Sequence, residues 1–535
     1  MKRRLQALLL TICLLAGSFS TACSNEKEKE ALNIIDDNYR NYYEIFVGSF
    51  YDSDGDGMGD LQGVIEKLDY INDGNDKTDT DLGFNGIWLM PIMPSDTYHK
   101  YDVKDYYDID EAYGTMEDME QLIEECHKRG INLIIDMVFN HTSASHPWFT
   151  EACNYLESLP EGTEPDVAQC KYVDYYNFAK DKSGIDTWHK VGNSDWYYEC
   201  VFWDQMPDLN LASENVRKEI EDIASFWLDK GVDGFRLDAA KEYYTGQVEK
   251  NVEVLSWFTN YVKSVDKDAY IVAEVWEKSD TIAQYYASGI TSLFNFPMSQ
   301  IDGRIGKTVR EIADDKSFTE AVESIDSKYR AQNPAYIDAP FISNHDTTRV
   351  AAQYAYNQDQ IKYAAGLLLT ESGSPFVYYG EEIGMASSGK KDENKRLAMY
   401  WSDEDKTGIA NDPVGADKVE QKFAPVDEQM EDENSIYNYY KKAIRIRNTY
   451  PEIARGTIQV VTGITQENVS ALTKTWEDNS IGIIYNSSSE ETKVSLKDMG
   501  MEKMSVCNYL TVDGSEITSS KEEIKMPPYS IVFLK

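Results

Sequence analysis

Eight short apolar runs alternate with helix-like segments between about residues 42 and 455, and this alternation constrains the fold more than any other feature. The runs are rich in Val, Ile, Phe and Tyr, which is typical of strands buried on both faces of a parallel sheet. Alternating β and α elements indicate the α/β class, and eight repeats predict a closed (β/α)8 TIM barrel. The runs are Glu44–Phe50, Gly86–Pro91, Asn132–Phe139, Gly234–Asp238, Tyr270–Val275, Ser292–Phe296, Phe341–His345 and Phe376–Tyr379.

Two of the intervening segments carry clear helix boundaries. Thr115 precedes one amphipathic segment, and Gly130 follows it before the third apolar run. Ser213 precedes Glu214–Lys230 in the same way, and Gly231 follows that segment. Ser and Thr are favoured N-cap residues, and glycine favours the end of a helix. We therefore expect helices between each of these pairs.

The barrel pattern is interrupted once and then ends. Residues 141–208 lack the barrel period, and so long a loop in a compact protein is usually functional or a small subdomain. We predict an inserted domain B there, after the third strand, which leaves 39–140 and 209–455 for the barrel. Residues 456–535 contain short runs separated by polar turns, which predict an antiparallel β-sandwich. Its expected strands are Thr457–Thr462, Asn468–Thr475, Ile481–Asn486, Thr492–Leu496 and Ile531–Leu534.

The amino-terminal segment has the pattern of a secretory signal. A basic start precedes the apolar stretch Leu5–Ala16, which is too short to span a bilayer, so we interpret residues 1–22 as a signal peptide. Ser20–Cys23 resembles a bacterial lipobox, although Ser stands where Leu is usual. This predicts lipidation of Cys23, a polar tether over 23–38, and an extracellular protein anchored to the bacterial cell membrane. The alternative is ordinary cleavage near Ala22.

Charge and cysteine content exclude several classes of function. The formal net charge is −41, which argues against nucleic-acid binding because that needs a basic surface. The cysteine spacing fits no zinc motif. Cys153, Cys170 and Cys200 share one irregular segment, where one disulfide and three free thiols are both open.

Three acidic residues close three of the apolar runs: Asp238, Glu274 and Asp346. Their spacings of 36 and 72 residues match one and two strand-plus-helix units. The carboxyl ends of parallel strands share one rim of a barrel, and that rim carries the active site in βα barrels. Two carboxylates flanking a bond are what glycoside hydrolysis requires. Any one of them alone could be an ordinary solvated acid, but their common position favours catalysis.

Five segments in order give the chain a family resemblance. They are Asp-Met-Val-Phe-Asn-His (136–141), Met-Pro-Asp-Leu-Asn (206–210), Gly-Phe-Arg-Leu-Asp-Ala-Ala-Lys (234–241), Glu-Val-Trp (274–276) and Ser-Asn-His-Asp (343–346). With these segments the chain resembles, across roughly residues 39–535, the α-amylase family of glycoside hydrolases, with features between the oligo-1,6-glucosidase and neopullulanase types. The resemblance implies Asp238 as nucleophile, Glu274 as general acid and then base, and Asp346 as stabiliser of the transition state.

The resemblance also implies a set of substrate-binding residues. His141 and His345 match histidines that hydrogen-bond the sugar, and Tyr101 matches a tyrosine that stacks on it; His99 and Asp102 are weaker candidates. The remaining candidates lie near the predicted nucleophile and stabiliser.

Arg236 lies two residues before Asp238, on the same face of the strand, where it can hold a positive charge beside the nucleophile. Lys241 resembles a residue on the leaving-group side, and Arg349 follows Asp346 closely enough to line the pocket. Many α-amylases have histidine after this lysine. Glu242 stands there instead, which puts in doubt a calcium site that uses that histidine's backbone.

An acidic loop follows the first apolar run and predicts a cation site. Oxygen ligands spaced along a glycine-containing loop suit Ca²⁺, and the resembling family has a structural calcium loop at this place. The loop looks like an EF-hand but has Gly63 where that motif has Glu, and a solvated acidic turn is the alternative. A second ion could lie between Asn140 and Asp208. The predicted ligands are Asp52, Asp54, Asp56, Asp60 and the carbonyl of Met58.

The expected activity is retaining hydrolysis of α-1,4-glucosidic bonds in starch and maltooligosaccharides. Ala239 follows the nucleophile, where relatives that cut α-1,6 bonds often carry Val. The alternatives are an α-1,6-glucosidase or neopullulanase, a glucan transferase, and a non-catalytic sugar-binding protein, which the three intact acids argue against. The α-glucan and, through Cys23, the membrane are the predicted partners, and Ca²⁺ is the one predicted cofactor.

Overall fold

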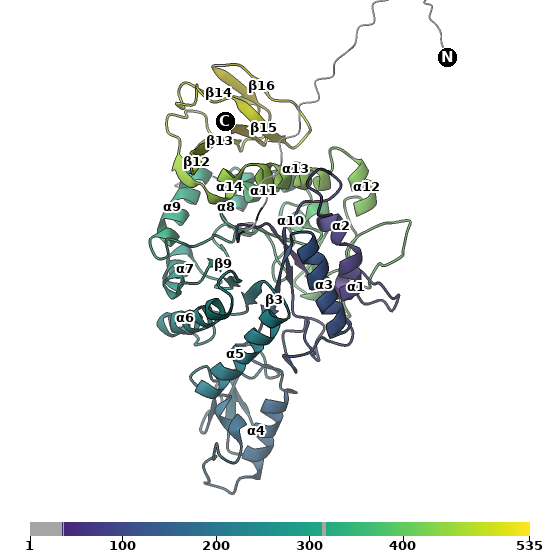
Figure 1. Cartoon of the computed structure of the whole chain (residues 1–535), viewed down its shortest axis with the longest axis vertical. Coiled ribbons are helices and arrows are strands. Elements are labelled where there is room, and N and C mark those ends of the chain that lie inside the picture. The colour runs from purple at the N-terminus through teal and green to yellow at the C-terminus, as the bar shows by residue number, and fades with distance from the viewer. Residues whose placement is uncertain (1–34, 36, 313–316) are drawn as a thin grey trace, which may run out of the picture. The chain divides into compact units, whose positions relative to one another are not determined.

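The computed structural model of the protein describes residues 35, 37–312 and 317–535 (Figure 1). The predicted signal peptide, the lipidation site Cys23 and most of the tether lie outside these residues. Within the described ranges, no helix combines the length and the apolar character needed to cross a membrane.

Seven parallel strands form the central sheet, in the order β10-β1-β2-β3-β7-β8-β9. The seventh apolar run and the residues just before it join the two edges through parallel bridges, Phe341 with Phe376 and Ala339 with Phe294. The ring therefore closes as a (β/α)8 barrel, which confirms the predicted fold class. The strands are β1 (Tyr42–Ile45), β2 (Gly86–Leu89), β3 (Asn132–Met137), β7 (Gly234–Leu237), β8 (Tyr270–Ala273), β9 (Ser292–Leu293) and β10 (Phe376–Tyr378).

Both predicted helix starts are confirmed. The Thr115 hydroxyl accepts a hydrogen bond from Asp118 N (3.3 Å) at the start of α3 (Met116–Lys128), and Ser213 caps α5 (Glu214–Asp229) in the same way. Gly130 has φ 72° and Gly231 has φ 101°, the left-handed conformation that favours glycine after a helix. The helix ends are therefore fixed by the residues that the sequence indicated.

Further helices pack around the barrel (Figure 1). Those before the sixth strand position are α1 (Leu61–Glu66), α2 (Leu68–Ile71), α6 (Val248–Val265), α7 (Ser279–Tyr285) and η3 (Tyr286–Ser288). Those after it are α8 (Arg304–Val309), α9 (Phe318–Arg330), α10 (Val350–Gln353), α11 (Gln358–Thr370), α12 (Val426–Glu431), α13 (Ile436–Thr449) and α14 (Pro451–Arg455). The short 3-10 turns η1 (Val47–Ser49), η4 (Glu381–Ile383) and η5 (Glu393–Lys395) follow barrel strands.

The segment after β3 forms a small unit of its own. It contains α4 (Pro147–Ser158), the turn η2 (Lys171–Asp174) and an antiparallel sheet in the order β4-β6-β5. A bridge between His141 and Asp208 joins its two ends. As described, Cys153, Cys170 and Cys200 are thiols, so the disulfide alternative is not seen. The strands are β4 (Phe178–Ala179), β5 (Trp188–Lys190) and β6 (Tyr197–Glu199).

The carboxyl-terminal region pairs two antiparallel sheets, in the orders β11-β12-β13-β18-β15 and β14-β17-β16, which confirms the predicted sandwich. Lys474 joins it to the barrel, because its buried ammonium group donates to the carbonyls of Thr370 (2.7 Å) and Ile453 (2.8 Å). The strands are β11 (Thr457–Val460), β12 (Val469–Trp476), β13 (Asn479–Asn486), β14 (Thr492–Ser495), β15 (Val506–Thr511), β16 (Thr518–Ser519), β17 (Glu523–Met526) and β18 (Ser530–Leu534).

Candidate active site

All three acids that the sequence singled out line one cavity of about 280 Å³. Asp238 and Glu274 directly follow β7 and β8, so the cavity opens at the carboxyl ends of the barrel strands. A larger cavity, of about 350 Å³, lies by Asn85 and Gly130, just before β2 and β3, away from these acids. The catalytic-rim cavity is lined by His99, Tyr101, His141, Phe202, Met206, Asp238, Ala239, Glu274, Asp346, Asp392 and Arg396.

Arg236 is the centre of the charged network beneath this cavity. Its Nη1 donates to Asp238 Oδ1 (2.7 Å) and Asp136 Oδ1 (2.9 Å), and its Nη2 contacts Glu274. The arginine side chain is only 1% exposed, whereas those of Asp238 and Glu274 are 12% and 16% exposed. Because one planar guanidinium binds both, the carboxyl groups of Asp238 and Glu274 lie close together in the same cavity.

The environment of Glu274 suits a group that must carry a proton. Burial raises the pKa of Glu274 to about 7, against the opposing effect of the Arg236 charge. Neighbouring Asp238 and Asp346 add to the rise because their negative charges disfavour a third one. A carboxyl group with such a pKa can serve as a general acid near neutral pH.

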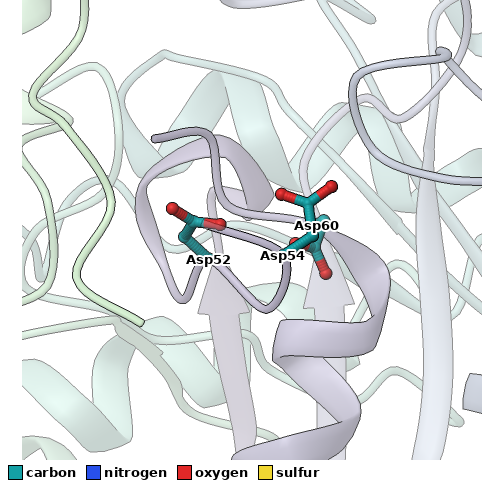
Figure 2. A group of neighbouring side chains, drawn as sticks. All are labelled: Asp52, Asp54 and Asp60. Atoms are coloured by element: carbon teal, nitrogen blue, oxygen red, sulfur yellow. The ribbon is translucent and has the colours of Figure 1, made fainter. Parts of the chain in front are cut away.

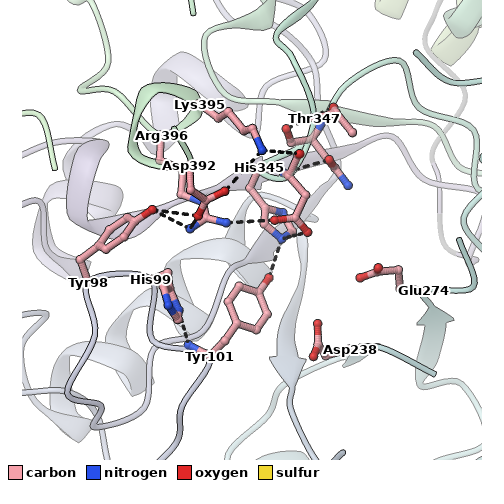
Figure 3. Close-up of polar contacts among 12 residues, drawn as sticks. Tyr98, His99, Tyr101, Asp238, Glu274, His345, Thr347, Asp392, Lys395 and Arg396 are labelled. Atoms are coloured by element: carbon pink, nitrogen blue, oxygen red, sulfur yellow. Dashed lines mark hydrogen bonds and ion pairs between the residues drawn. The ribbon is translucent and has the colours of Figure 1, made fainter. Parts of the chain in front are cut away.

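Asp346 lies between two cations, His345 and Arg396, and Figure 3 shows both of these away from Asp238 and Glu274. Its Oδ2 is 3.1 Å from His345 Nε2, and its Oδ1 accepts from Arg396 Nη2 at 3.0 Å. Burial alone would raise the pKa of Asp346, but the charges of His345 and Arg396 outweigh it and hold that pKa well below its usual range. Asp346 is therefore held in its ionised form.

His345 is fully buried in the floor of the site. Burial acts to lower its pKa, but the carboxylates of Asp346 and Glu44 outweigh burial and raise the pKa to about 10. Its Nε2 also lies 2.8 Å from the hydroxyl of Tyr101, whose ring stacks on the imidazole. The imidazole is thus an imidazolium that faces acids on both edges.

His141 has a free ring nitrogen in the cavity wall. Nδ1 accepts from Asn140 Nδ2 (3.3 Å), which assigns the proton to Nε2, and this buried Nε2 has no hydrogen-bond partner among the described residues. Phe202 packs edge-on against the imidazole. Such an unpartnered buried donor fits a hydroxyl group of a bound ligand.

Other predicted substrate contacts lie elsewhere. Arg349 does not line the cavity, because its guanidinium is buried on Tyr378 and Tyr379 and its Nη1 donates to the Tyr379 carbonyl (2.5 Å). Lys241 does not line it either, since its ammonium binds Glu277 Oε1 (3.2 Å). Of the weaker candidates, His99 lines the cavity, whereas Asp102 does not line it and accepts from the Ser95 hydroxyl (2.5 Å).

Sequence reasoning missed a second wall, which comes from the irregular segment after β10. Arg396 binds Asp346, and its Nη1 also pairs with Asp392 Oδ2 (2.5 Å). The Tyr98 hydroxyl donates to the same Asp392 oxygen (2.9 Å). The one available signal was the charged run 390–396, but no strand period ties that run to the barrel rim.

The acidic loop brings three carboxylates together (Figure 2). Asp52, Asp54 and Asp60 each offer one oxygen within 4.8 Å of the others. Ca²⁺ takes oxygen ligands at about 2.3–2.6 Å, so oxygens on opposite sides of the ion lie at about this spacing. The geometry fits a hard cation. Asp56 is outside the group, and its side chain accepts from Met58 N (2.7 Å).

At the suggested second ion site, both carboxylate oxygens of Asp208 accept hydrogen bonds from the protein. Asp208 Oδ1 accepts from Asn140 Nδ2 (3.3 Å), and its Oδ2 accepts from Val201 N (3.0 Å). Burial raises the pKa of Asp208 to about 8.

Comparisons with known proteins decide the family. Residues 44–456, more than half of the chain, match the family described as "Alpha amylase, catalytic domain". The chain belongs to the α-amylase family. This α-amylase-family glycoside hydrolase is 38% identical over 505 residues to "Alpha-amylase 3" of Dictyoglomus thermophilum, and the match covers 93% of each chain. It is 29% identical to an oligo-1,6-glucosidase of Parageobacillus thermoglucosidasius, covering 91% of this chain and 96% of that protein.

Solved structures agree with this assignment. The structure of Eubacterium rectale Amy13B is 46% identical, with a TM-score of 0.90, and the match covers 95% of this chain and 97% of that one. The α-amylase from H. orenii is 35% identical, with a TM-score of 0.80 and coverage of 93% and 99%. The α-amylase-family fold of this chain is therefore shared with solved structures.

Proposed function

We propose that this α-amylase-family enzyme hydrolyses α-1,4-glucosidic bonds of maltooligosaccharides and starch with retention of configuration. The observation that supports this most is that Arg236 holds Asp238 and Glu274 against the same cavity. Retaining glycosidases need a nucleophile and an acid/base about 5–5.5 Å apart. Two carboxyl groups that share one guanidinium suit that separation.

The proposed reaction has two steps. Glu274 protonates the leaving glycosidic oxygen while Asp238 attacks the anomeric carbon and forms a covalent glycosyl-enzyme. The Glu274 carboxylate then takes a proton from water, which attacks the same carbon and releases Asp238. Asp346, held ionised by its two cations, favours the positive charge that develops on the sugar.

The sugar contacts follow from the walls of the cavity. Tyr101 offers its ring to one face of the glucosyl unit, and His141 Nε2 donates to a hydroxyl group. Aromatic rings suit the apolar faces of sugars. Ala239 lines the cavity beside the nucleophile, and its small side chain leaves that wall open for the next sugar of an α-1,4 chain.

Product analysis on maltotetraose, panose and pullulan tests the bond specificity. We expect the α-1,4 bonds of maltotetraose to be cut fastest, whereas preferred cleavage of the α-1,6 bond of panose would reject the proposal. The rival reading has support in the relative named oligo-1,6-glucosidase. New, longer oligosaccharides among the products would indicate glucan transfer. An Asp238→Asn variant controls for contaminating enzymes.

We also propose a structural Ca²⁺ bound by Asp52, Asp54 and Asp60. The convergence of their oxygens supports it, and the ion would stabilise the loop after β1 without entering the chemistry. A chelator should lower the melting temperature, and Ca²⁺ should restore it. Unchanged melting with chelator would count against the ion.

Finally, we propose that Cys23 anchors the enzyme to the outer face of the bacterial cell membrane. The support is the signal-like segment and the lipobox-like Ser20–Cys23. Labelled palmitate should enter the wild-type protein and not a Cys23→Ser variant, which should leave the membrane fraction. Equal labelling of both proteins would reject the anchor.

A further inference from the structure

Glu44 is a buried acid of the barrel that the proposed reaction does not use. It lies on β1, in register with Trp88 of β2 and Tyr378 of β10, and its side chain is 1% exposed. Its Oε1 lies 2.5 Å from Nδ1 of His345, a residue 301 positions later in the chain. Burying a charged residue in a barrel strand costs free energy unless the charge is paired. The contact with His345 supplies that pairing for Glu44.

The opposite edge of the His345 ring faces the reaction centre. Nε2 lies 3.1 Å from Asp346 Oδ2 and 2.8 Å from the Tyr101 hydroxyl. That hydroxyl is also 3.1 Å from Asp136 Oδ2. The His345 ring therefore connects Glu44 on β1 directly with Asp346 and, through the Tyr101 hydroxyl, with Asp136.

The charged groups around His345 come from several strands. Glu44 comes from β1, Asp136 from β3, Arg236 from β7, Glu274 from the end of β8, and Asp346 from the segment next to the histidine itself. Only Glu44 and Asp346 contact the ring directly. Of these two, Asp346 faces the cavity, so Glu44 is the acid that substrate does not reach.

The protonation of His345 decides the direction of the hydrogen bonds. With both nitrogens protonated, Nδ1 donates to Glu44 and Nε2 donates toward Asp346 and the Tyr101 oxygen. The Tyr101 hydroxyl is then free to donate to Asp136. A neutral ring carrying its proton on Nδ1 would instead accept from Tyr101 and would offer Asp346 a lone pair in place of a proton.

We propose that Glu44 is a positioning residue of the active site, whose carboxylate keeps His345 doubly protonated so that His345 holds Asp346 ionised and turns the Tyr101 hydroxyl toward Asp136. This inference rests on the proposed function of the same site. Glu44 touches neither substrate nor the reacting atoms. It acts through His345, as a carboxylate behind a histidine commonly fixes both its charge and its orientation.

The test is the isosteric variant Glu44→Gln, which removes the charge and keeps the shape. Histidine labelled with ¹⁵N reports ring protonation directly, and a His345→Asn variant assigns the signal among the six histidines. We expect an imidazolium signal for His345 at neutral pH in the wild type and a proton affinity at least about tenfold weaker in Glu44→Gln, one pKa unit or more. An unchanged titration in the variant would overturn the proposal.

The matched control is Glu382→Gln. Glu382 is equally buried and accepts from the hydroxyls of Tyr43 (2.7 Å) and Tyr70 (2.6 Å), but it does not contact His345. Its substitution should leave the His345 signal unchanged. A shift of equal size in both variants would show a general loss of structure and would overturn the specific role of Glu44.

Kinetics provide the second readout. In Glu44→Gln, kcat should fall by about tenfold or more while KM changes little, because the lost effect acts on the transition state. Unchanged kcat together with a shifted His345 titration would overturn the positioning role. If no α-glucan is cleaved even by the wild type, the proposed function fails, while the ¹⁵N titration still decides whether Glu44 sets the charge of His345.

Discussion

Arg236 and Asp238 lie two residues apart at the end of β7 and form an ion pair of 2.7 Å whose arginine is sealed from solvent. The same guanidinium reaches Asp136 on β3 and Glu274 after β8. Arg236 stays protonated, because the negative charges of the surrounding acids outweigh burial and keep the pKa of Arg236 well above its usual range. The separation of nucleophile and acid is therefore set by one side chain that substrate does not touch.

The first prediction concerns the shape of that side chain. Arg236→Lys keeps the positive charge but loses the planar fork, and a lysine cannot bind three carboxylates in the same geometry. We expect kcat/KM to fall by about a hundredfold or more, as is usual when reacting groups are misplaced. Steady-state kinetics on maltotetraose measure the loss. Arg217→Lys, at the exposed fork with Glu253, is the control and should retain activity.

The second prediction separates the two catalytic carboxyl groups. Asp238→Asn and Glu274→Gln should each lower turnover of maltotetraose by about a thousandfold or more. A maltosyl fluoride has a leaving group that needs no proton, so Glu274→Gln should still release fluoride rapidly from it, whereas Asp238→Asn should not. A fluoride-release assay measures both. Equal loss in the two variants would contradict the assigned roles.

The third prediction is a pH dependence. Burial raises the pKa of Glu274 to about 7, so its proton is present below that pH and is lost above it. We expect kcat/KM for maltotetraose to decline on the alkaline side with an apparent pKa near 7, since kcat/KM reports the free enzyme.

The same shift affects stability. A raised folded-state pKa gives a contribution that is complete below the usual value for Glu and is lost as pH rises toward 7. Glu274→Gln should therefore flatten that part of the stability curve measured by thermal unfolding. If kcat/KM of Glu274→Gln for the maltosyl fluoride still declines on the alkaline side as in the wild type, that decline belongs to another group.

The strand-end acids could be predicted because parallel strands impose a common rim. Asp238, Glu274 and Asp346 needed only the alternation of apolar runs to be placed together. Glu44 also left a signal, a lone acid within a buried run, although its partner 301 residues away could not be read from the sequence. Arg396 left only a charged run, and its segment has no strand period that fixes its position.

Side-chain direction was the harder problem. Arg349 precedes α10 close to Asp346, yet stacking on Tyr378 and Tyr379 turns it away from the cavity. In the sandwich, β15 was missed because polar residues and a register shift between Val506 and Asn508 interrupt its alternation. Sequence spacing fixes which elements meet, whereas rotamers and bulges depend on neighbours that only the folded chain supplies.

The last prediction distinguishes two aspartates of the acidic loop, Asp54 and Asp56, which the sequence pattern predicted equally as ligands. Asp54 offers an oxygen to the three-carboxylate group, whereas Asp56 lies outside that group and its carboxylate accepts from Met58 N. Each also accepts from a backbone N–H two residues on, and asparagine can keep that turn, so Asn substitutions differ mainly in the lost charge and ligand.

Asp54→Asn should therefore weaken Ca²⁺ binding, while Asp56→Asn should bind nearly as the wild type does. Binding to the folded state alone raises stability with ligand concentration, so thermal unfolding over a Ca²⁺ titration measures both variants. The expected result is a melting curve that responds to Ca²⁺ only at much higher concentration for Asp54→Asn. Only Asp54→Asn changes a carboxylate of the converging group. Equal responses to Ca²⁺ in the two variants would therefore show that those carboxylates do not bind the ion.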